Sequence, residues 1–162
     1  GLVTFNEYFD TFVPASKQVG QMQTLLENLY KQETTFGETD FSALCGHLGK
    51  HVNKRSFLVL YTNFSNMTSL NRQLVYLQQL ARQHRVLVVF FEDADLKEYI
   101  AGKSVTTEDY YRHVIAEKFA FEKRLIVSTL KQHGIYSLLT TPDKLSIDVI
   151  NKYLEMKSRQ LL

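Results

Sequence analysis

The chain has 162 residues, of which 44% are apolar and 22% charged, which is the size and composition of one globular domain with a buried core. Its 19 lysines and arginines against 17 aspartates and glutamates leave a formal charge of only +2, which argues against a dedicated nucleic-acid binder. The single cysteine, Cys45, excludes an intrachain disulfide, and the longest apolar run, Val86–Phe91, is far shorter than the about 20 residues of a membrane span.

The first third of the chain predicts a hairpin and two helices. Leu2–Phe5 and Phe9–Val13 are short β-rich runs joined by three residues, which is typical of a hairpin. Apolar residues at three- and four-residue spacing predict an amphipathic helix from Lys17 to about Glu33, and a shorter helix is expected from about Asp40 to Val52. The apolar stripe of the longer helix comprises Val19, Met22, Leu25, Leu26, Leu29 and Tyr30.

Three apolar runs in the rest of the chain predict strands buried on both faces. They are Ser56–Thr62, Arg85–Glu92 and Ile135–Leu139, and helical patterns separate them. Because strands alternate with helices, the expected fold is one three-layer α/β domain spanning residues 1–162. We expect a mostly parallel sheet with helices on both faces and the hairpin as an antiparallel edge.

The helices of this part are expected at Thr68–His84, Thr106–His133 and Ser146–Arg159. Gly134 is well placed to end the long middle helix, and His84 is interpreted as a cation that offsets a helix dipole. The apolar stripe of the long helix comprises Tyr111, Val114, Ile115, Phe119, Leu125, Ile126 and Leu130. The charged residues on the same helix alternate in sign, which is typical of a solvated face: Glu117, Lys118, Glu122, Lys123 and Arg124.

Two groups of residues carry ligand chemistry. Cys45, His47 and His51 suggest a metal site, but the chain lacks a further cysteine and the glutamate of the H-E-x-x-H motif, so the pattern does not favour zinc. A second group, formed by Glu92, Asp93 and Asp95, follows a buried strand, where ligands bind in open α/β sheets. These acids could hold magnesium. The simpler interpretation, which we favour, is a polar loop with a capped turn.

The segment before the second helix has a similar double interpretation. Thr39 or Asp40 is suited to be the N-cap of that helix, with its side-chain oxygen accepting from free backbone N–H groups. Alternatively, the same polar residues contribute to an ion site. Motifs for dinucleotide binding, for a phosphate loop and for a nucleophile elbow do not occur in the sequence.

Two segments together resemble a known family. GETDFSAL (Gly37–Leu44) resembles the G-x-T-[DN] segment of von Willebrand factor A-like domains, and LVLYTNF (Leu58–Phe64) resembles their next strand. The hairpin, the long helix and the final helix extend the resemblance over nearly the whole chain. They point to a bacterial branch of unknown function that is encoded beside MoxR-type AAA+ ATPases.

The resemblance implies a sheet of order 3-2-1-4-5-6 and a metal-ion-dependent adhesion site at its carboxyl ends. Thr39 matches the threonine of that site, and Asn63 stands where the family has an aspartate. The D-x-S-x-S loop is not in this chain, so we expect a truncated domain without the central first strand and its helix. Since Thr39 and Asn63 offer only neutral oxygens, we expect no tight magnesium binding and no cofactor here. Magnesium is expected only in a full-length protein that carries the loop.

The predicted function is a non-enzymatic protein-interaction module with a degenerate metal site, and the resemblance implies an AAA+ ATPase as its partner. The alternative is a metal-dependent hydrolase or phosphotransfer enzyme that uses the acidic loop after strand 85–92. We expect the chain to be soluble and cytoplasmic, and a membrane would be reached only through segments outside it. Relatives with apolar helices ahead of the domain imply a parent anchored to the inner membrane. Without the central strand a strand edge is uncovered, so either the hairpin closes the gap against Ser56–Thr62 or two chains complete one another. We predict a dimer or a strand-exchanged assembly.

Overall fold

A computed structural model describes residues 1–7, 9–33, 39–92, 96, 99–100, 102 and 106–161 of the chain. It divides into two compact units, Gly1–Asn53 and Lys54–Leu162, each of which combines helices with strands. The expected α/β character is therefore confirmed. The assignment of the whole chain to a single domain stays a prediction.

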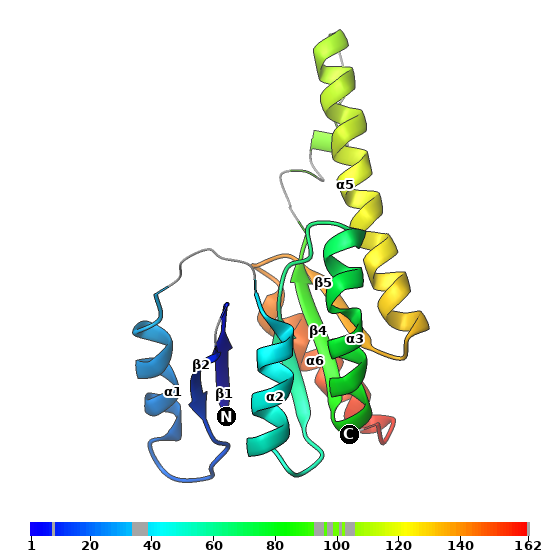
Figure 1. Cartoon of the computed structure of the whole chain (residues 1–162). Helices are drawn as coiled ribbons and strands as arrows, with labels where there is room; N and C mark the ends of the chain where they lie inside the picture. The colour runs from blue at the N-terminus through cyan, green and yellow to red at the C-terminus, as the bar shows by residue number, and fades with distance from the viewer. Residues whose placement is uncertain are drawn as a thin grey trace. The chain divides into compact units, whose positions relative to one another are not determined.

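The first unit contains the predicted hairpin. Strands β1 (Leu2–Phe5) and β2 (Phe9–Val13) pair antiparallel with Leu2 opposite Val13, and the register shifts once between Thr4 and Phe5 (Figure 1). Both strand bounds match the sequence prediction. The expected place of the hairpin, at the edge of a larger sheet, is wrong for the described residues, because the hairpin forms a two-stranded sheet of its own.

Two helices complete this unit, α1 (Gln21–Tyr30) and α2 (Phe41–His51). Helix α1 is shorter than predicted because Gly20 precedes it with a φ of 91°, a left-handed conformation that interrupts a helix. None of its residues is buried, so the predicted apolar stripe of this helix is not part of the core. Helix α2 packs against the hairpin, with the rings of Phe5 and Phe41 5.4 Å apart and edge to face.

The second unit is built on a three-stranded parallel sheet. Its strands β3 (Phe57–Tyr61), β4 (Arg85–Phe91) and β5 (Tyr136–Thr140) lie side by side in that order. Only β4 is buried on both faces as predicted, and its residues 86–90 are almost inaccessible to water. The prediction of full burial is wrong for β3 and β5, which are half-buried along most of their length because each has a neighbouring strand on one side only.

Helices cover both faces of this sheet. Figure 1 shows α3 (Met67–Gln83) and α5 (Thr107–Gln132) on one face and α6 (Leu145–Ser158) on the other, which gives the expected three layers within this unit. Each begins and ends within a few residues of its predicted bounds. No helix in the described part of the chain is apolar over the length needed to cross a bilayer.

The long helix α5 extends beyond the sheet of its own unit (Figure 1). Its first turn is held by a capping box in which the Thr106 hydroxyl accepts from the Asp109 N–H and the Asp109 carboxylate accepts from the Thr106 N–H, both at 3.1 Å. At its end Gly134 adopts a φ of 71°, and the Ile135 N–H donates to the Leu130 carbonyl at 2.9 Å, as in a Schellman motif. Both ends of α5 are thus capped by local hydrogen bonds.

The apolar stripe predicted for α5 is only partly buried. Ile126 and Leu130 are in the core, whereas the five other residues of the stripe are exposed: Tyr111, Val114, Ile115, Phe119 and Leu125. The exposure of the first four follows from the length of the helix, since the first half of α5 lies past the strands that the second half covers (Figure 1). Leu125 lies in the second half, so helix length does not explain its exposure.

Candidate binding site at the carboxyl ends of the strands

A cavity of about 870 Å³ lies in the second unit, at the ends of β3 and β4 and beside the middle of α5. Its described polar lining consists of Asn63, Ser65, Glu92, Lys123 and Arg124. Its described apolar lining consists of Phe91, Leu96, Ile100, Phe119 and Ala120. The cavity therefore occupies the edge of the sheet at which parallel α/β proteins bind ligands.

The ammonium group of Lys123 organises the inner part of this site. Its Nζ donates to the side-chain oxygen of Asn63 and, at 2.8 Å, to the backbone carbonyl of Phe64. The same nitrogen lies 5.8 Å from the ring centre of Phe90, in the range of a cation–π contact. These contacts tie α5 to the chain that leaves β3.

The charge of Lys123 is not neutralised by an ion pair among the described residues. Burial lowers the pKa of its ammonium group from the ordinary value, because desolvation disfavours the charged form. Its hydrogen-bond acceptors are a neutral amide oxygen and a neutral carbonyl oxygen. A cation without an opposite charge among the described residues thus faces a cavity with largely apolar walls.

The residues predicted for a degenerate metal site have different surroundings. Thr39 is half-buried in the first unit, whereas Asn63 belongs to the second. Asn63 already accepts a hydrogen bond from Lys123. A divalent cation on that oxygen would lie beside an ammonium ion, and like charges at such a distance repel each other. The geometry therefore disfavours magnesium at Asn63, and the expected lack of tight magnesium binding stays a prediction.

Of the acidic loop, only Glu92 can be placed. Its side chain lines the cavity, and its backbone N–H donates to the Thr140 carbonyl at 2.9 Å. Asp93 and Asp95 lie outside the described residues. Within the described part of the chain, no group of three or more His, Cys, Asp or Glu residues could hold a metal ion.

At the start of α2, Asp40 rather than Thr39 is the N-cap. Its carboxylate accepts from the N–H groups of Ser42 at 2.7 Å and Ala43 at 3.1 Å, two donors that would otherwise lack a partner in the first turn. N-capping of α2 therefore explains why an acidic residue stands at position 40.

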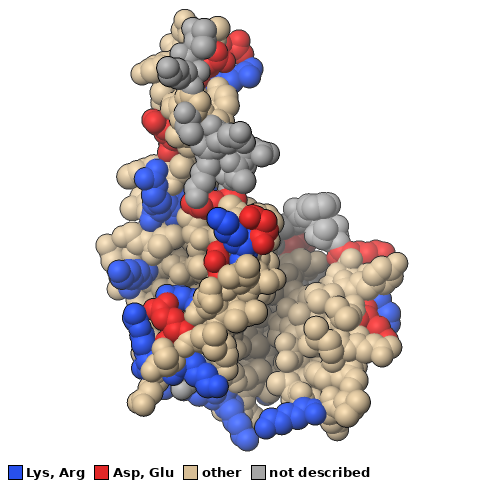
Figure 2. Space-filling model, turned by 180° about the vertical axis from the view of Figure 1, so that it is seen from behind, with Lys and Arg blue, Asp and Glu red and all other residues tan. Residues whose placement is uncertain are grey.

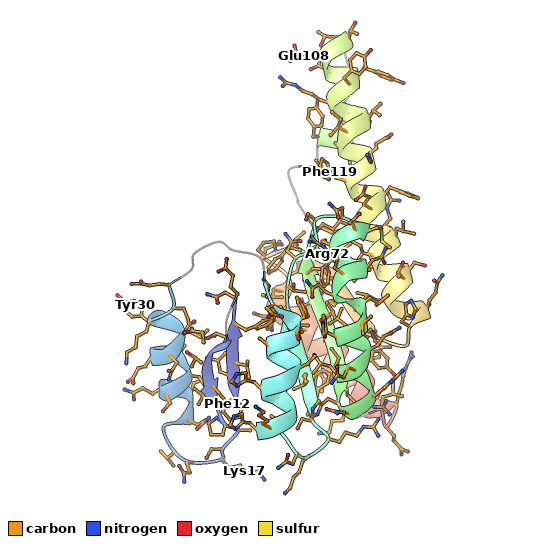
Figure 3. All side chains as sticks on the ribbon, in the orientation of Figure 1. Phe12, Lys17, Tyr30, Arg72, Glu108 and Phe119 are labelled. Carbon is orange, nitrogen blue, oxygen red and sulfur yellow. The ribbon has the colours of Figure 1, made fainter. Side chains whose placement is uncertain are left out.

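The cysteine and histidines of α2 have structural surroundings. Cys45 is buried, and burial together with the Asp40 carboxylate raises the pKa of its thiol to about 11. The ring of His51 lies 6.1 Å from that of His47 and 5.2 Å from that of Phe12, which is labelled in Figure 3. These histidines pack as flat rings on each other and on the hairpin.

The interpretation of Lys123 as a solvated charge is wrong. The alternating charges around Lys123 predict a solvated face. The spacing of Lys123 to two core residues instead predicts that its side chain is partly buried. Lys123 precedes Ile126 by three positions and Leu130 by seven, so the three side chains share one side of α5. Sequence reasoning could have used this spacing to place the ammonium at the buried face.

Comparison with family models, with curated proteins and with solved structures found no match to this chain. The von Willebrand factor A-like resemblance is therefore not tested by these comparisons.

Proposed function

We propose that this chain is a non-enzymatic protein-interaction module that binds its partner through one side of α5. The observation that carries the proposal is the α5 apolar face, defined as Tyr111, Val114, Ile115 and Phe119, which is exposed in the described structure. These residues follow the three- and four-residue spacing of a single helix side. Soluble proteins rarely leave such a contiguous apolar surface without a partner.

The energetics support a docking function. About half of the Ile115 and Phe119 side chains is exposed, 54% and 51% respectively. Covering a half-exposed side chain of this size contributes about 1 kcal/mol. Where α5 is visible in Figure 2, uncharged side chains form most of its surface, with a few acidic and basic groups among them. An apolar centre with a polar margin is typical of protein interfaces.

The helix is also suited to present a preformed surface. Beside the capping box, the Arg112 guanidinium donates to the Glu108 carboxylate at 2.6 Å, one helical turn away. Tyr99 braces the same region, since its hydroxyl donates to the Asp109 carbonyl at 3.4 Å and its ring lies 6.2 Å from that of His113. A surface that is ordered before binding loses less conformational entropy when the partner docks.

The partner that we propose is a MoxR-type AAA+ ATPase. This part rests on the resemblance of the chain to the von Willebrand factor A-like branch that is encoded beside such ATPases. An apolar helix side is consistent with a protein partner of this kind and does not specify it.

The test is a binding measurement between the chain and an ATPase of this type, with and without nucleotide. Val114→Gln with Ile115→Gln should weaken binding about tenfold or more, because glutamine keeps helix propensity but removes the apolar contact. Val75→Gln on α3 is the matched control, since Val75 is 66% exposed and lies on another helix. Equal loss of binding in the double variant and in the Val75→Gln control would contradict the proposed surface, and no association under any condition would overturn the ATPase as partner.

Self-association is a further part of the proposal. Strand β3 is the outer strand of its sheet, and no strand among the described residues pairs with its outer edge. An open edge offers backbone N–H and C=O groups to another chain. Light scattering should therefore detect dimers at high concentration, and a clean monomer would contradict this part.

The alternative function, a metal-dependent hydrolase or phosphotransfer enzyme, would use Glu92 with Asp93 and Asp95. Lys123 lines the same cavity as Glu92, and its ammonium opposes a divalent cation there. We therefore do not favour this alternative. Calorimetric titration with magnesium or manganese tests it, and saturable heat with a thermal shift would revive it.

A further inference from the structure

We propose that the cavity at the strand ends binds a small organic monocarboxylate with an apolar body, whose carboxylate contacts the ammonium group of Lys123. This inference is independent of the proposed partner. It concerns the cavity rather than the α5 apolar face, although Phe119 contributes to both.

The size and walls of the cavity suit a small molecule. Its volume of about 870 Å³ falls within the roughly 300–1,000 Å³ of ordinary ligand sites. Phe91, Phe119, Leu96 and Ile100 offer two aromatic rings and two aliphatic side chains to the body of a ligand. Figure 3 labels Phe119 on α5, beyond the ends of the strands of the same unit.

Lys123 supplies a fixed hydrogen-bond donor at this site. An ammonium group has three N–H donors, and the described residues accept two of them, through the Asn63 side chain and the Phe64 carbonyl. Phe64 is itself buried, so the acceptor that holds the ammonium is anchored in the core. No other described residue accepts from the third donor, so a ligand can do so without a large rearrangement of the side chain.

The charge balance of the described lining selects a monoanion. Lys123 and Arg124 are cationic and Glu92 is anionic, which leaves one net positive charge among these residues. A cationic ligand would meet the ammonium of Lys123, and a neutral ligand would leave that ammonium without an opposite charge. Since a hydrogen bond between two charged groups is stronger than one between neutral groups, a carboxylate at Lys123 gains most from this arrangement.

The experiment compares two probes of the same shape on the full chain at pH 7 by isothermal titration calorimetry. We expect 4-phenylbutyrate to bind about tenfold more tightly than 4-phenylbutan-1-ol, which has the same apolar body without the charge. Lys123→Met should remove this preference, because methionine keeps much of the side-chain length but no donor. Lys123→Arg should retain it.

Controls separate a local effect from unfolding and from the proposed partner surface. Circular dichroism checks that the Lys123→Met variant is folded. If this variant is unfolded, the affinities of the two probes for wild type and for Lys123→Arg decide whether the cavity prefers the carboxylate. Val114→Gln with Ile115→Gln should leave binding of 4-phenylbutyrate unchanged, because neither residue lines the cavity.

Three results would overturn the proposal. Equal affinity for the two probes would remove the role of the charge, and absence of binding by both would remove the site. Tighter binding of the dianion phenyl phosphate than of 4-phenylbutyrate would contradict the monocarboxylate class. Because none of these measurements involves a protein partner, their failure leaves the proposed docking function intact.

Discussion

Folding stability should fall at mildly acidic pH because of one buried histidine. His84, interpreted from the sequence as a cation at a helix end, is instead only 2% exposed, so that interpretation is wrong. Its Nδ1 accepts from the Ser56 N–H at 3.3 Å, so the neutral ring carries its proton on Nε2, which has no hydrogen-bond partner in the described structure. Burial lowers the pKa of His84 below the ordinary value of 6.5, since desolvation disfavours the imidazolium.

The sign of the effect follows from proton linkage. Because the folded state has the lower pKa, the unfolded chain binds more protons below about pH 6.5, and stability decreases as the pH falls. The contribution of neutral His84 is complete above that pH and is lost progressively below it, down to the folded pKa. For one proton, the slope approaches about 1.4 kcal/mol per pH unit. Protonation also turns Nδ1 into a donor that faces the Ser56 N–H.

The measurement is urea unfolding of wild type and His84→Asn between pH 7.5 and 5.5. Asparagine keeps an acceptor near Nδ1 but does not titrate, so the difference in unfolding free energy between the two proteins isolates His84. We expect wild type to lose its advantage over the variant as the pH falls. His133→Asn is the matched control for an exposed histidine at a helix end. A wild-type minus His84→Asn difference that stays constant over this range would refute the reasoning.

Three further predictions concern stability and reactivity. Asp40→Ala should destabilise the first unit by about 1 kcal/mol in denaturant unfolding, because two N–H groups lose their acceptor, whereas Ser42→Ala should have a smaller effect. Phe90→Ala should destabilise the second unit by about 3–5 kcal/mol, since this side chain is fully buried in β4, and an unchanged urea midpoint would contradict that core assignment. Cys45 should react slowly with iodoacetamide at pH 8 until the chain unfolds, because with a pKa of about 11 only about one thiol in a thousand is ionised. Equal reaction rates in the folded and the unfolded protein would contradict the burial of Cys45.

Local chemistry made much of the fold predictable. The hairpin, the buried strand β4 and the main helices follow from short-range patterns of apolar residues, and their bounds agree with the structure to within a few residues, except for the shorter α1. Asp40 was one of two predicted caps, and Gly134 was the predicted helix end. Such features depend on hydrogen bonds and backbone conformations among neighbours in the chain, so the sequence by itself determined them.

Only the tertiary structure decided which apolar and charged side chains are covered. Periodicity indicates that Phe119 and Leu130 share a helix side, but coverage depends on how far the sheet reaches along α5, which is a property of residues distant in sequence. The same long-range packing buries His84, brings Lys123 to Asn63 and leaves the hairpin as a separate sheet. A pattern of 3.6 residues determines which side chains face the same way. The desolvation that gives Lys123 and His84 their chemistry arises only when distant segments pack around them.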